Sequence, residues 1–274
     1  LWLKKPSECS EEEYKSFYSK VFADFTEPLF WIHLNVDYPF NLKGILYFPR
    51  LSGRMDNMQG EIKLYNNQVY VADNIKEVIP EFLMLLKGVI DCPDMPLNVS
   101  RSFLQNDGTL KKIRDHITKK VSDRLCGMFD SSREEYEKCW QDIGVFIKYG
   151  CMREEKFCER IYGDIVFNDI NGDYYTLSEY LEKFAPEKKI YYVTNAVQQA
   201  GYISLFKENG LNAVILDGVI DQPFINFLES KEQGLTMARI DADIASALKG
   251  EGGGEFSSLC EQFKLIAGEN TEVS

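Results

Sequence analysis

The sequence predicts an α/β (α+β) protein with a large α/β sandwich unit whose sheet is mainly antiparallel, a helical connector and a small parallel-sheet βαβ unit. Three observations support this. Strand-like runs of aromatic and branched residues crowd the first hundred residues, apolar residues at helical spacing dominate the middle, and strands alternate with helices after residue 189. With 274 residues, 45% of them hydrophobic and 27% charged, the chain can fill several cores and has an ordinary soluble composition.

The charge balance and the absence of certain segments exclude several classes. A net charge of -12, from 43 acidic and 31 basic residues, disfavours nucleic acid and anionic membranes as partners. No run approaches the ~18 to 20 apolar residues of a membrane span, and the first residues lack the order of a signal peptide. We therefore expect a cytoplasmic protein. The chain starts at Leu1 without a methionine, which we interpret as a fragment of something longer.

Cysteines and histidines offer little chemistry. The seven cysteines are odd in number, scattered and without a C-x-x-C pair, which predicts reduced thiols, several of them in the core, rather than disulfides or zinc ligands. His33 lies in a strand-like run and His116 on the charged face of a helix, so we expect structural or surface roles for both. We predict no metal site.

The first elements follow from local signals. Ser10 and Glu13 form a capping box that opens a helix, and apolar residues recur at helical spacing until Pro28. Aromatic and branched residues predict strands at 30–36 and 42–48. Residues 62–65 and 68–71 alternate around Asn66-Asn67, which predicts a hairpin, and Pro80 predicts the start of a helix that Gly88 ends.

The middle of the chain is predicted to be helical. Thr109 would cap a long helix whose apolar stripe runs from Leu110 to Met128. A second capping box, Ser132 to Glu135, would open a helix that Gly150 ends, and a short helix would cover 153–161.

The last third predicts right-handed βαβ units. Residues 169–173 resemble a calcium loop, but the required glycine and glutamate are replaced by Tyr174 and Tyr180, so we predict an Asn-Gly turn followed by a capping box at 176–179. The strands and helices after it are expected at 190–193, 197–207, 213–216, 222–228 and 235–240.

These elements divide the chain into four parts. We predict a large α/β unit at 1–130, a helical connector at 131–162, a small α/β unit at 163–248, and at 249–274 a glycine-rich linker with the start of a truncated domain.

The candidate site lies at residues 94–105. Pro96 favours an extended Met95, and Asn98 or Ser100 can cap a short helix after it. Arg101 and Gln105, four residues apart, would then share one helix face, and a guanidinium beside an amide suits an oxygen-rich anion such as phosphate. The alternative is a solvated polar pair at a helix start. A basic stripe nearby could help attract an anion or be solvated; it consists of Lys111, Lys112, Arg114, Lys119 and Lys120.

Several motifs, in order, resemble the middle domain of the heat-shock protein 90 family, the bacterial HtpG type included. They begin with Leu1-Trp2 and 5–8, continue through 45–50, 62–65, 71–74, 79–83 and 88–91, and end with 190–194. The block Pro96 to Arg101, followed by Leu104-Gln105, is the most specific of them. The similarity covers nearly the whole chain.

The resemblance implies an ATP-dependent chaperone of protein folding and the stress response, with an N-terminal ATP domain, this middle domain and a C-terminal dimerisation domain in a homodimer. It implies that Arg101 reaches the terminal phosphate of ATP, which the N-terminal domain holds with Mg²⁺, and that Gln105 supports this contact. It also implies that Trp2 contacts client proteins. Residues 51–58 depart from the family pattern, because they lack the aromatic residues that dock the ATP domain; Leu51, Met55 and Met58 could replace them.

Two other interpretations are weighed against this one. The chain could be a non-catalytic α/β scaffold for protein interactions, in which Arg101 is an ordinary surface residue. A self-contained enzyme is disfavoured, because no histidine-centred, metal or phosphate-loop pattern occurs. As an isolated fragment the chain is expected to be inactive towards ATP.

Overall fold

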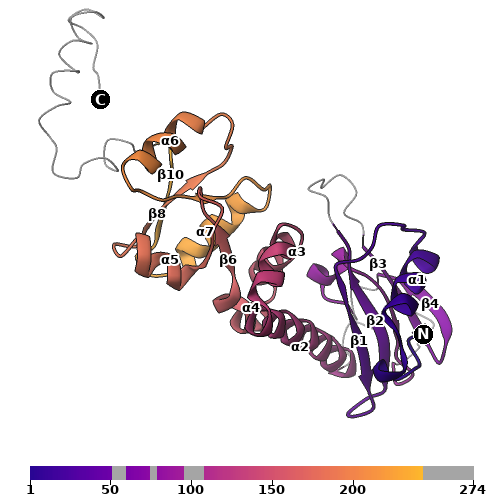
Figure 1. Cartoon of the computed structure of the whole chain (residues 1–274). Helices are drawn as coiled ribbons and strands as arrows, with labels where there is room; N and C mark the ends of the chain where they lie inside the picture. The colour runs from indigo at the N-terminus through magenta and orange to yellow at the C-terminus, as the bar shows by residue number, and fades with distance from the viewer. Residues whose placement is uncertain (51–59, 75–78, 96–107, 243–274) are drawn as a thin grey trace, which may run out of the picture. The chain divides into compact units, whose positions relative to one another are not determined.

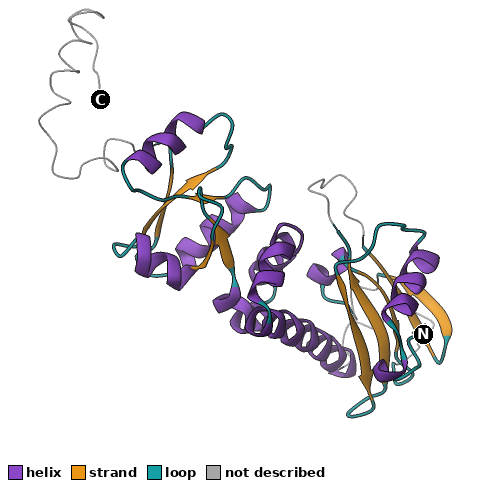
Figure 2. Ribbon diagram, in the orientation of Figure 1, coloured by secondary structure: helices purple, strands orange, loops and turns teal. Residues whose placement is uncertain are grey.

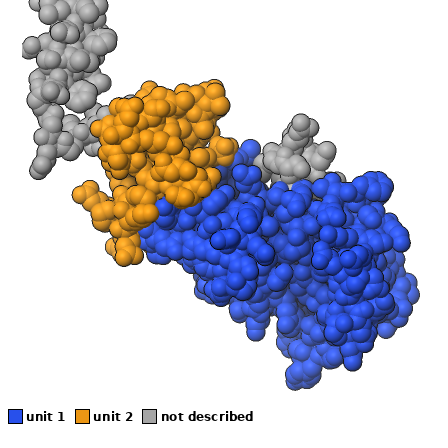
Figure 3. Space-filling view, viewed as in Figure 1, with its two compact units in different colours: residues 1–167, 174–179, 218–227 blue, residues 168–173, 180–217, 228–274 orange. Residues whose placement is uncertain are grey.

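The computed structural model describes residues 1–50, 60–74, 79–95 and 108–242. It divides into two compact units, coloured blue and orange in Figure 3. The first unit consists of Leu1–Phe167, Tyr174–Glu179 and Gly218–Phe227, and the second of Asn168–Asp173, Tyr180–Asp217 and the chain from Leu228 on. Each unit has its own apolar core.

The first unit contains a five-stranded sheet in the order β1-β2-β5-β3-β4 (Figures 1 and 2). Its strands are β1 Phe30–Val36, β2 Leu42–Phe48, β3 Glu61–Asn66, β4 Val69–Asp73 and β5 Lys87–Asp91. All neighbours are antiparallel except β3 and β5, which run parallel. The prediction of a mainly antiparallel sheet is confirmed, and the bounds of β1 and β2 are those predicted.

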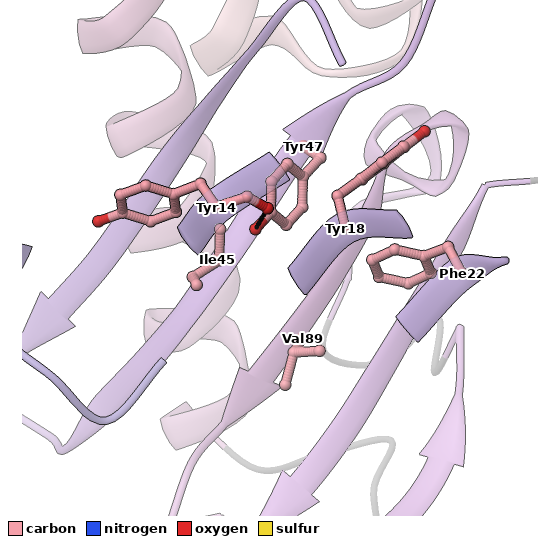
Figure 4. Packing of buried hydrophobic residues seen from close by; sticks show 6 residues of the cluster. All are labelled: Tyr14, Tyr18, Phe22, Ile45, Tyr47 and Val89. Carbon is pink, nitrogen blue, oxygen red and sulfur yellow. Dashed lines mark hydrogen bonds between the residues drawn. The ribbon is translucent and has the colours of Figure 1, made fainter. Parts of the chain in front are cut away.

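Helix α1 (Glu11–Phe22), which follows the 3-10 turn η1 (Pro6–Glu8), packs on one face of this sheet. Figure 4 shows three of its aromatic side chains against residues of β2 and β5: Tyr14, Tyr18 and Phe22 meet Ile45, Tyr47 and Val89. The Tyr47 hydroxyl donates to the backbone carbonyl of Tyr14 at 3.0 Å, so this otherwise apolar layer satisfies its buried hydroxyl.

The first unit contains further helices. The 3-10 helix η3 Glu81–Leu85 lies between β4 and β5 in the chain, and β5 is followed by α2 Gly108–Ser131, α3 Arg133–Arg153, α4 Glu155–Ile161 and η5 Tyr162–Asp164. The predicted apolar stripe of α2 is buried from Leu110 to Met128. Phe146 of α3 packs edge-on against Phe48 of β2, with ring centroids 5.2 Å apart, and so joins the helical layer to the sheet.

The second unit is built on a parallel three-stranded sheet in the order β10-β8-β9. The elements of the last third are β6 Val166–Asn168, β7 Tyr174–Thr176, α5 Leu177–Phe184, β8 Lys189–Val193, α6 Ala200–Glu208, β9 Val214–Ile215, α7 Asp221–Lys231 and β10 Thr236–Arg239. The predicted alternation of strands and helices is confirmed. So is the Asn-Gly turn, where Gly172 has φ 91°.

The hairpin between β3 and β4 turns one residue later than predicted. Asn67 and Gln68 have φ of 50° and 67°, the pair of positive angles that a two-residue hairpin turn requires. Asn66 belongs to the strand and is buried. Its side chain is used in the core, which a turn propensity cannot reveal.

Two predicted glycine stops are wrong. The segment after Pro80 forms only the short 3-10 helix η3, and Gly88 lies inside β5, where a Cβ would stand 2.8 Å from the carbonyl oxygen of Ile45. Helix α3 passes through Gly150, whose Cβ would lie 2.7 Å from the Phe157 ring. Both glycines permit close approach instead of ending a helix.

Of the three predicted capping boxes, two are confirmed. Glu13 N–H donates to Ser10 Oγ at 3.3 Å, and Glu179 N–H donates to Thr176 Oγ1 at 3.3 Å. The Ser132 hydroxyl makes no capping bond. Ser132 alone separates α2 from α3, and its ψ of 62° differs from the extended geometry of a capping residue.

Helix α2 begins two residues earlier than predicted, because a helix capped by Thr109 would start at Leu110. It starts at Gly108, so Thr109 lies within its first turn and is not the residue before it.

Candidate functional site

Arg101 and Gln105 lie outside the described residues, as do the rest of 96–107, the loop 51–59 and the linker at 250–255. The structure does describe both flanks of the arginine segment, which we define as residues 96–107. Strand β5 and a turn at Cys92–Met95 precede it, and α2 follows it. Both flanks belong to the first unit.

The turn before the arginine segment is held on its inner side by Asn66. Met95 N–H donates to the Cys92 carbonyl at 3.2 Å, which closes the turn. The Asn66 amide nitrogen lies 3.0 Å from the Cys92 carbonyl, 3.2 Å from that of Pro93 and 3.2 Å from that of Met95. Three carbonyls, two of them buried and that of Pro93 partly buried, thus share one amide group.

A second contact holds the same turn from its other side. Asp94 Oδ2 accepts from the backbone N–H of Asn41 at 2.7 Å and from its side-chain amide at 3.1 Å. Sequence reasoning missed Asn41, Asn66 and Asp94. The Asn66-Asn67 pair did stand out, but it indicated a turn and gave no sign of its partners.

The helix on the other flank carries the basic stripe. Lys111, Lys112, Lys119 and Lys120 are exposed, and Arg114 is paired with Glu154 across 3.3 Å. His116 is half-buried with its ring edge-on to Phe40, and burial, with Lys120 and Lys119 nearby, lowers its pKa. The four lysines therefore form a solvated cationic face, and the histidine is neutral at neutral pH.

Trp2 is half-buried and lies between Phe17 and Tyr65 in a row of aromatic rings that we call the aromatic strip: Phe17, Trp2, Tyr65 and Tyr70. Successive ring centroids are 5.8, 5.4 and 5.7 Å apart. Tyr70 is 52% exposed and its neighbour Val69 is 68% exposed, on β4 at the edge of the sheet. The Trp2 indole N–H lies 3.5 Å from Oδ2 of buried Asp91, which also accepts from Gln68 N–H at 2.9 Å. The Trp2 side chain is thus packed against neighbouring rings on part of its surface and exposed to solvent on the rest.

His33 has a structural environment. Its Nδ1 lies 2.6 Å from the Tyr14 hydroxyl, and the Tyr14 ring stands edge-on to it. Burial lowers the pKa of His33, against the opposing effect of the backbone carbonyls of Trp2 and Lys4. The hydrogen bond between the imidazole and the tyrosine hydroxyl is part of the packing between α1 and β1, so the predicted structural role of His33 is confirmed.

The cysteines of the described ranges are thiols, and Cys92, Cys151 and Cys158 are buried, as predicted for core cysteines. Burial raises the pKa of Cys92 to about 11 and that of Cys126 to about 12, so neither is a thiolate at neutral pH.

Metal-binding clusters and membrane-spanning helices are both absent from the described residues. Residues 1–50, 60–74, 79–95 and 108–242 include no cluster of three or more histidine, cysteine, aspartate or glutamate side chains that could hold a metal ion. None of the helices in these ranges has the length and apolar character that a membrane crossing demands. The calcium-like loop uses Asp169 for its own turn, because Oδ1 accepts from Asn171 N–H at 2.8 Å and Asp173 N–H at 2.9 Å.

Comparison with known proteins gives a consistent picture. The family model described as "Hsp90 protein" matches residues 1–246. A chaperone protein HtpG of Bacteroides fragilis is 45% identical over 255 residues, and one of Porphyromonas gingivalis is 44% identical over 254. In both cases the match covers 90% of this chain and 37% of the relative. The chain therefore spans little more than a third of the length of these relatives.

A solved structure supports the fold. The middle domain of a heat shock protein of Plasmodium falciparum superposes with a TM-score of 0.66 at 23% identity, covering 88% of this chain and 98% of that one.

Proposed function

Since this chain belongs to the Hsp90 family, as a middle domain of the HtpG type, we propose that it is the middle segment of an ATP-driven, homodimeric chaperone that assists protein folding in the cytoplasm. The observation that carries the proposal is the block Pro96 to Arg101, with Gln105 four residues later, in a chain of this family. ATP is the substrate and is held, with Mg²⁺, mainly by the N-terminal domain of the full-length protein.

In this proposal Arg101 contacts the terminal phosphate of ATP across a domain boundary. A guanidinium is always protonated and offers several N–H donors, so it stabilises the negative charge that spreads over the transferring phosphoryl group. Such an arginine contributes on the order of 10^3 in rate. Gln105 supports the contact by donating or accepting one hydrogen bond beside it. The exposed lysines of α2 supply a weaker, screened attraction.

The test is ATP turnover by the full-length protein that contains this chain. Arg101→Ala is expected to lower kcat on the order of 10^3-fold while ATP affinity changes little, because nucleotide binding belongs to another domain. Gln105→Ala is expected to have a smaller effect of the same kind. Lys138→Ala, which removes an exposed cation of α3, is the matched control and should leave kcat unchanged.

Turnover near the wild-type rate in a folded Arg101→Ala protein contradicts the catalytic role. The chain would then be the non-catalytic interaction scaffold, and the aromatic strip favours that second function, because it presents apolar rings at the edge of a sheet.

We also propose that client proteins bind along the aromatic strip. Trp2 and Tyr65 offer rigid apolar area, and Tyr70 and Val69 extend it into solvent on β4. Unfolded clients expose apolar side chains, so a strip of this kind matches their chemistry.

A further inference from the structure

We infer that Asn66 is a positioning residue for the arginine segment: its amide fixes the turn at Cys92–Met95 from which that segment departs. The inference rests on the function proposed for Arg101. It concerns a side chain that touches neither nucleotide nor client and acts only through the backbone it holds.

Asn66 holds the turn through three hydrogen-bonding contacts. We call these contacts, together with that of Asn41 with Asp94, the clamp. The residue is 7% exposed, and its Nδ2 lies within 3.2 Å of the carbonyls of Cys92, Pro93 and Met95. The amide group has two N–H donors for three acceptors, so it fills the inner side of the turn. Removal of the Asn66 amide leaves the turn carbonyls without this donor. We therefore expect the turn to change its conformation.

The orientation of the amide is itself fixed. Asn67 Nδ2 donates to Asn66 Oδ1 at 2.9 Å, so the oxygen faces the hairpin and the nitrogen faces the turn. Cys92 N–H donates to the Tyr65 carbonyl at 3.0 Å, and Gln68 N–H donates to Asp91 at 2.9 Å. The hairpin is therefore joined to the turn through Asn66 and the Tyr65 carbonyl, and to the adjoining end of β5 through Gln68.

The Asn41 contact makes the clamp two-sided. Asn41 precedes β2, Asn66 ends β3, and both hold the same four residues of the chain through different atoms. Two residues that are distant in sequence thus hold one four-residue turn.

The reason to expect a catalytic effect is the place of this turn in the sequence. Met95 is followed in the sequence by Pro96, a residue type that restricts the backbone of the residue before it, and Arg101 comes five residues after Pro96. An arginine that must meet a phosphate at hydrogen-bond distance tolerates little displacement, since about 1 Å can cost on the order of 10^2-fold in rate.

The test measures kcat and ATP affinity separately in the full-length protein. Asn66→Ala and Asn66→Asp, which keeps the shape but loses the donor, are each expected to lower kcat on the order of tenfold with ATP affinity unchanged. Asp94→Ala removes the contact with Asn41 and should lower kcat to a similar extent, again with ATP affinity unchanged. Asn212→Ala is the control, because Asn212 is 9% exposed, donates to Asp169 at 2.7 Å and belongs to the second unit.

Amide hydrogen exchange provides a readout that a general loss of stability does not imitate. In Asn66→Ala the Met95 amide should exchange on the order of tenfold faster, while the β2–β5 amides near Ile45 and Val89 keep their protection. Equal acceleration throughout the sheet would mean that Asn66 only stabilises the fold, and would overturn the inference. If the Asn66 variants do not fold, Asp94→Ala decides by the same two measurements.

Arg101→Ala, assayed in parallel, separates the two proposals. If Arg101→Ala lowers kcat but folded Asn66 and Asp94 variants turn over ATP at the wild-type rate, the positioning role is wrong and the proposed function stands. If Arg101→Ala itself turns over ATP normally, the proposed function fails and the positioning inference fails with it.

Discussion

The Lys148 ammonium lies 2.5 Å from Oδ1 of Asp221, and the two side chains are only 10% and 7% exposed. The ammonium also lies over the rings of Trp140 and Phe224, 6.0 and 5.8 Å from their centroids. The second oxygen of Asp221 accepts from Gly218 N–H at 2.8 Å. The pair therefore joins α3 to the start of α7 within the first unit, although 73 residues separate its members.

Breaking this pair on one side should be costly. Lys148→Met leaves a buried carboxylate without its cation, and we expect a loss of about 3 kcal/mol in the free energy of unfolding. The double variant Lys148→Met with Asp221→Asn removes both charges and keeps an acceptor for Gly218, so it should recover most of that loss. Urea denaturation of the chain measures the free energy of unfolding of the single and the double variant. A double variant as unstable as the single one would contradict this account.

Asp24 should make stability depend on pH in the acid range. Burial alone raises its pKa, but hydrogen bonds from Lys87, Tyr18 and the Thr26 N–H prevail and lower it from 3.8 to about 2. A carboxyl with a depressed pKa stabilises the fold above its unfolded pKa, and that contribution disappears as the pH falls through about 2.

The variant that tests this is Asp24→Asn. We expect it to cost about 1 to 2 kcal/mol at pH 7, discounted because the side chain is 23% exposed. The difference from the wild type should shrink between about pH 4 and 2. Denaturation at a series of pH values checks the prediction, and a difference independent of pH would contradict it.

Two glycines should respond to alanine in opposite directions. At Gly44 in β2 a Cβ would stand 2.5 Å from the carbonyl oxygen of Val89 in the neighbouring strand, so Gly44→Ala should destabilise by about 2 kcal/mol or more. At Gly127, exposed on α2, a Cβ meets no described atom within 4 Å. Gly127→Ala should therefore stabilise by about 0.5 to 1 kcal/mol, because alanine loses less backbone freedom in a helix. Thermal unfolding of each variant beside the wild type measures both changes in stability.

Trp2→Ala should weaken client binding more than it weakens the fold. The measurement is suppression of aggregation of a chemically unfolded test protein, followed by light scattering, beside the unfolding free energy of the variant. Phe25→Ala is the control, since Phe25 is 91% exposed but lies outside the aromatic strip. Equal suppression by the Trp2 variant and the wild type would place the client surface elsewhere.

Some functional residues were within reach of sequence reasoning and others were not. Arg101, Gln105 and Trp2 stand in recognisable motifs, so a resemblance could assign them roles. All three roles remain predictions, and Arg101 and Gln105 lie outside the described residues. Asn41 and Asp94 carry no local pattern. Their importance comes from a contact across 53 positions in the sequence.

The sequence by itself determined the local elements: β1, β2, the capping boxes at Ser10 and Thr176, the apolar stripe of α2 and the βαβ alternation of the last third. These follow from periodicity and capping, which act over a few residues. Only the tertiary structure decided that β5 inserts between β2 and β3, that Gly88 and Gly150 permit close approach, and that Asn66 faces a turn from another part of the chain. Each depends on atoms far apart in sequence, whose contact is fixed when the sheet and the helices pack together.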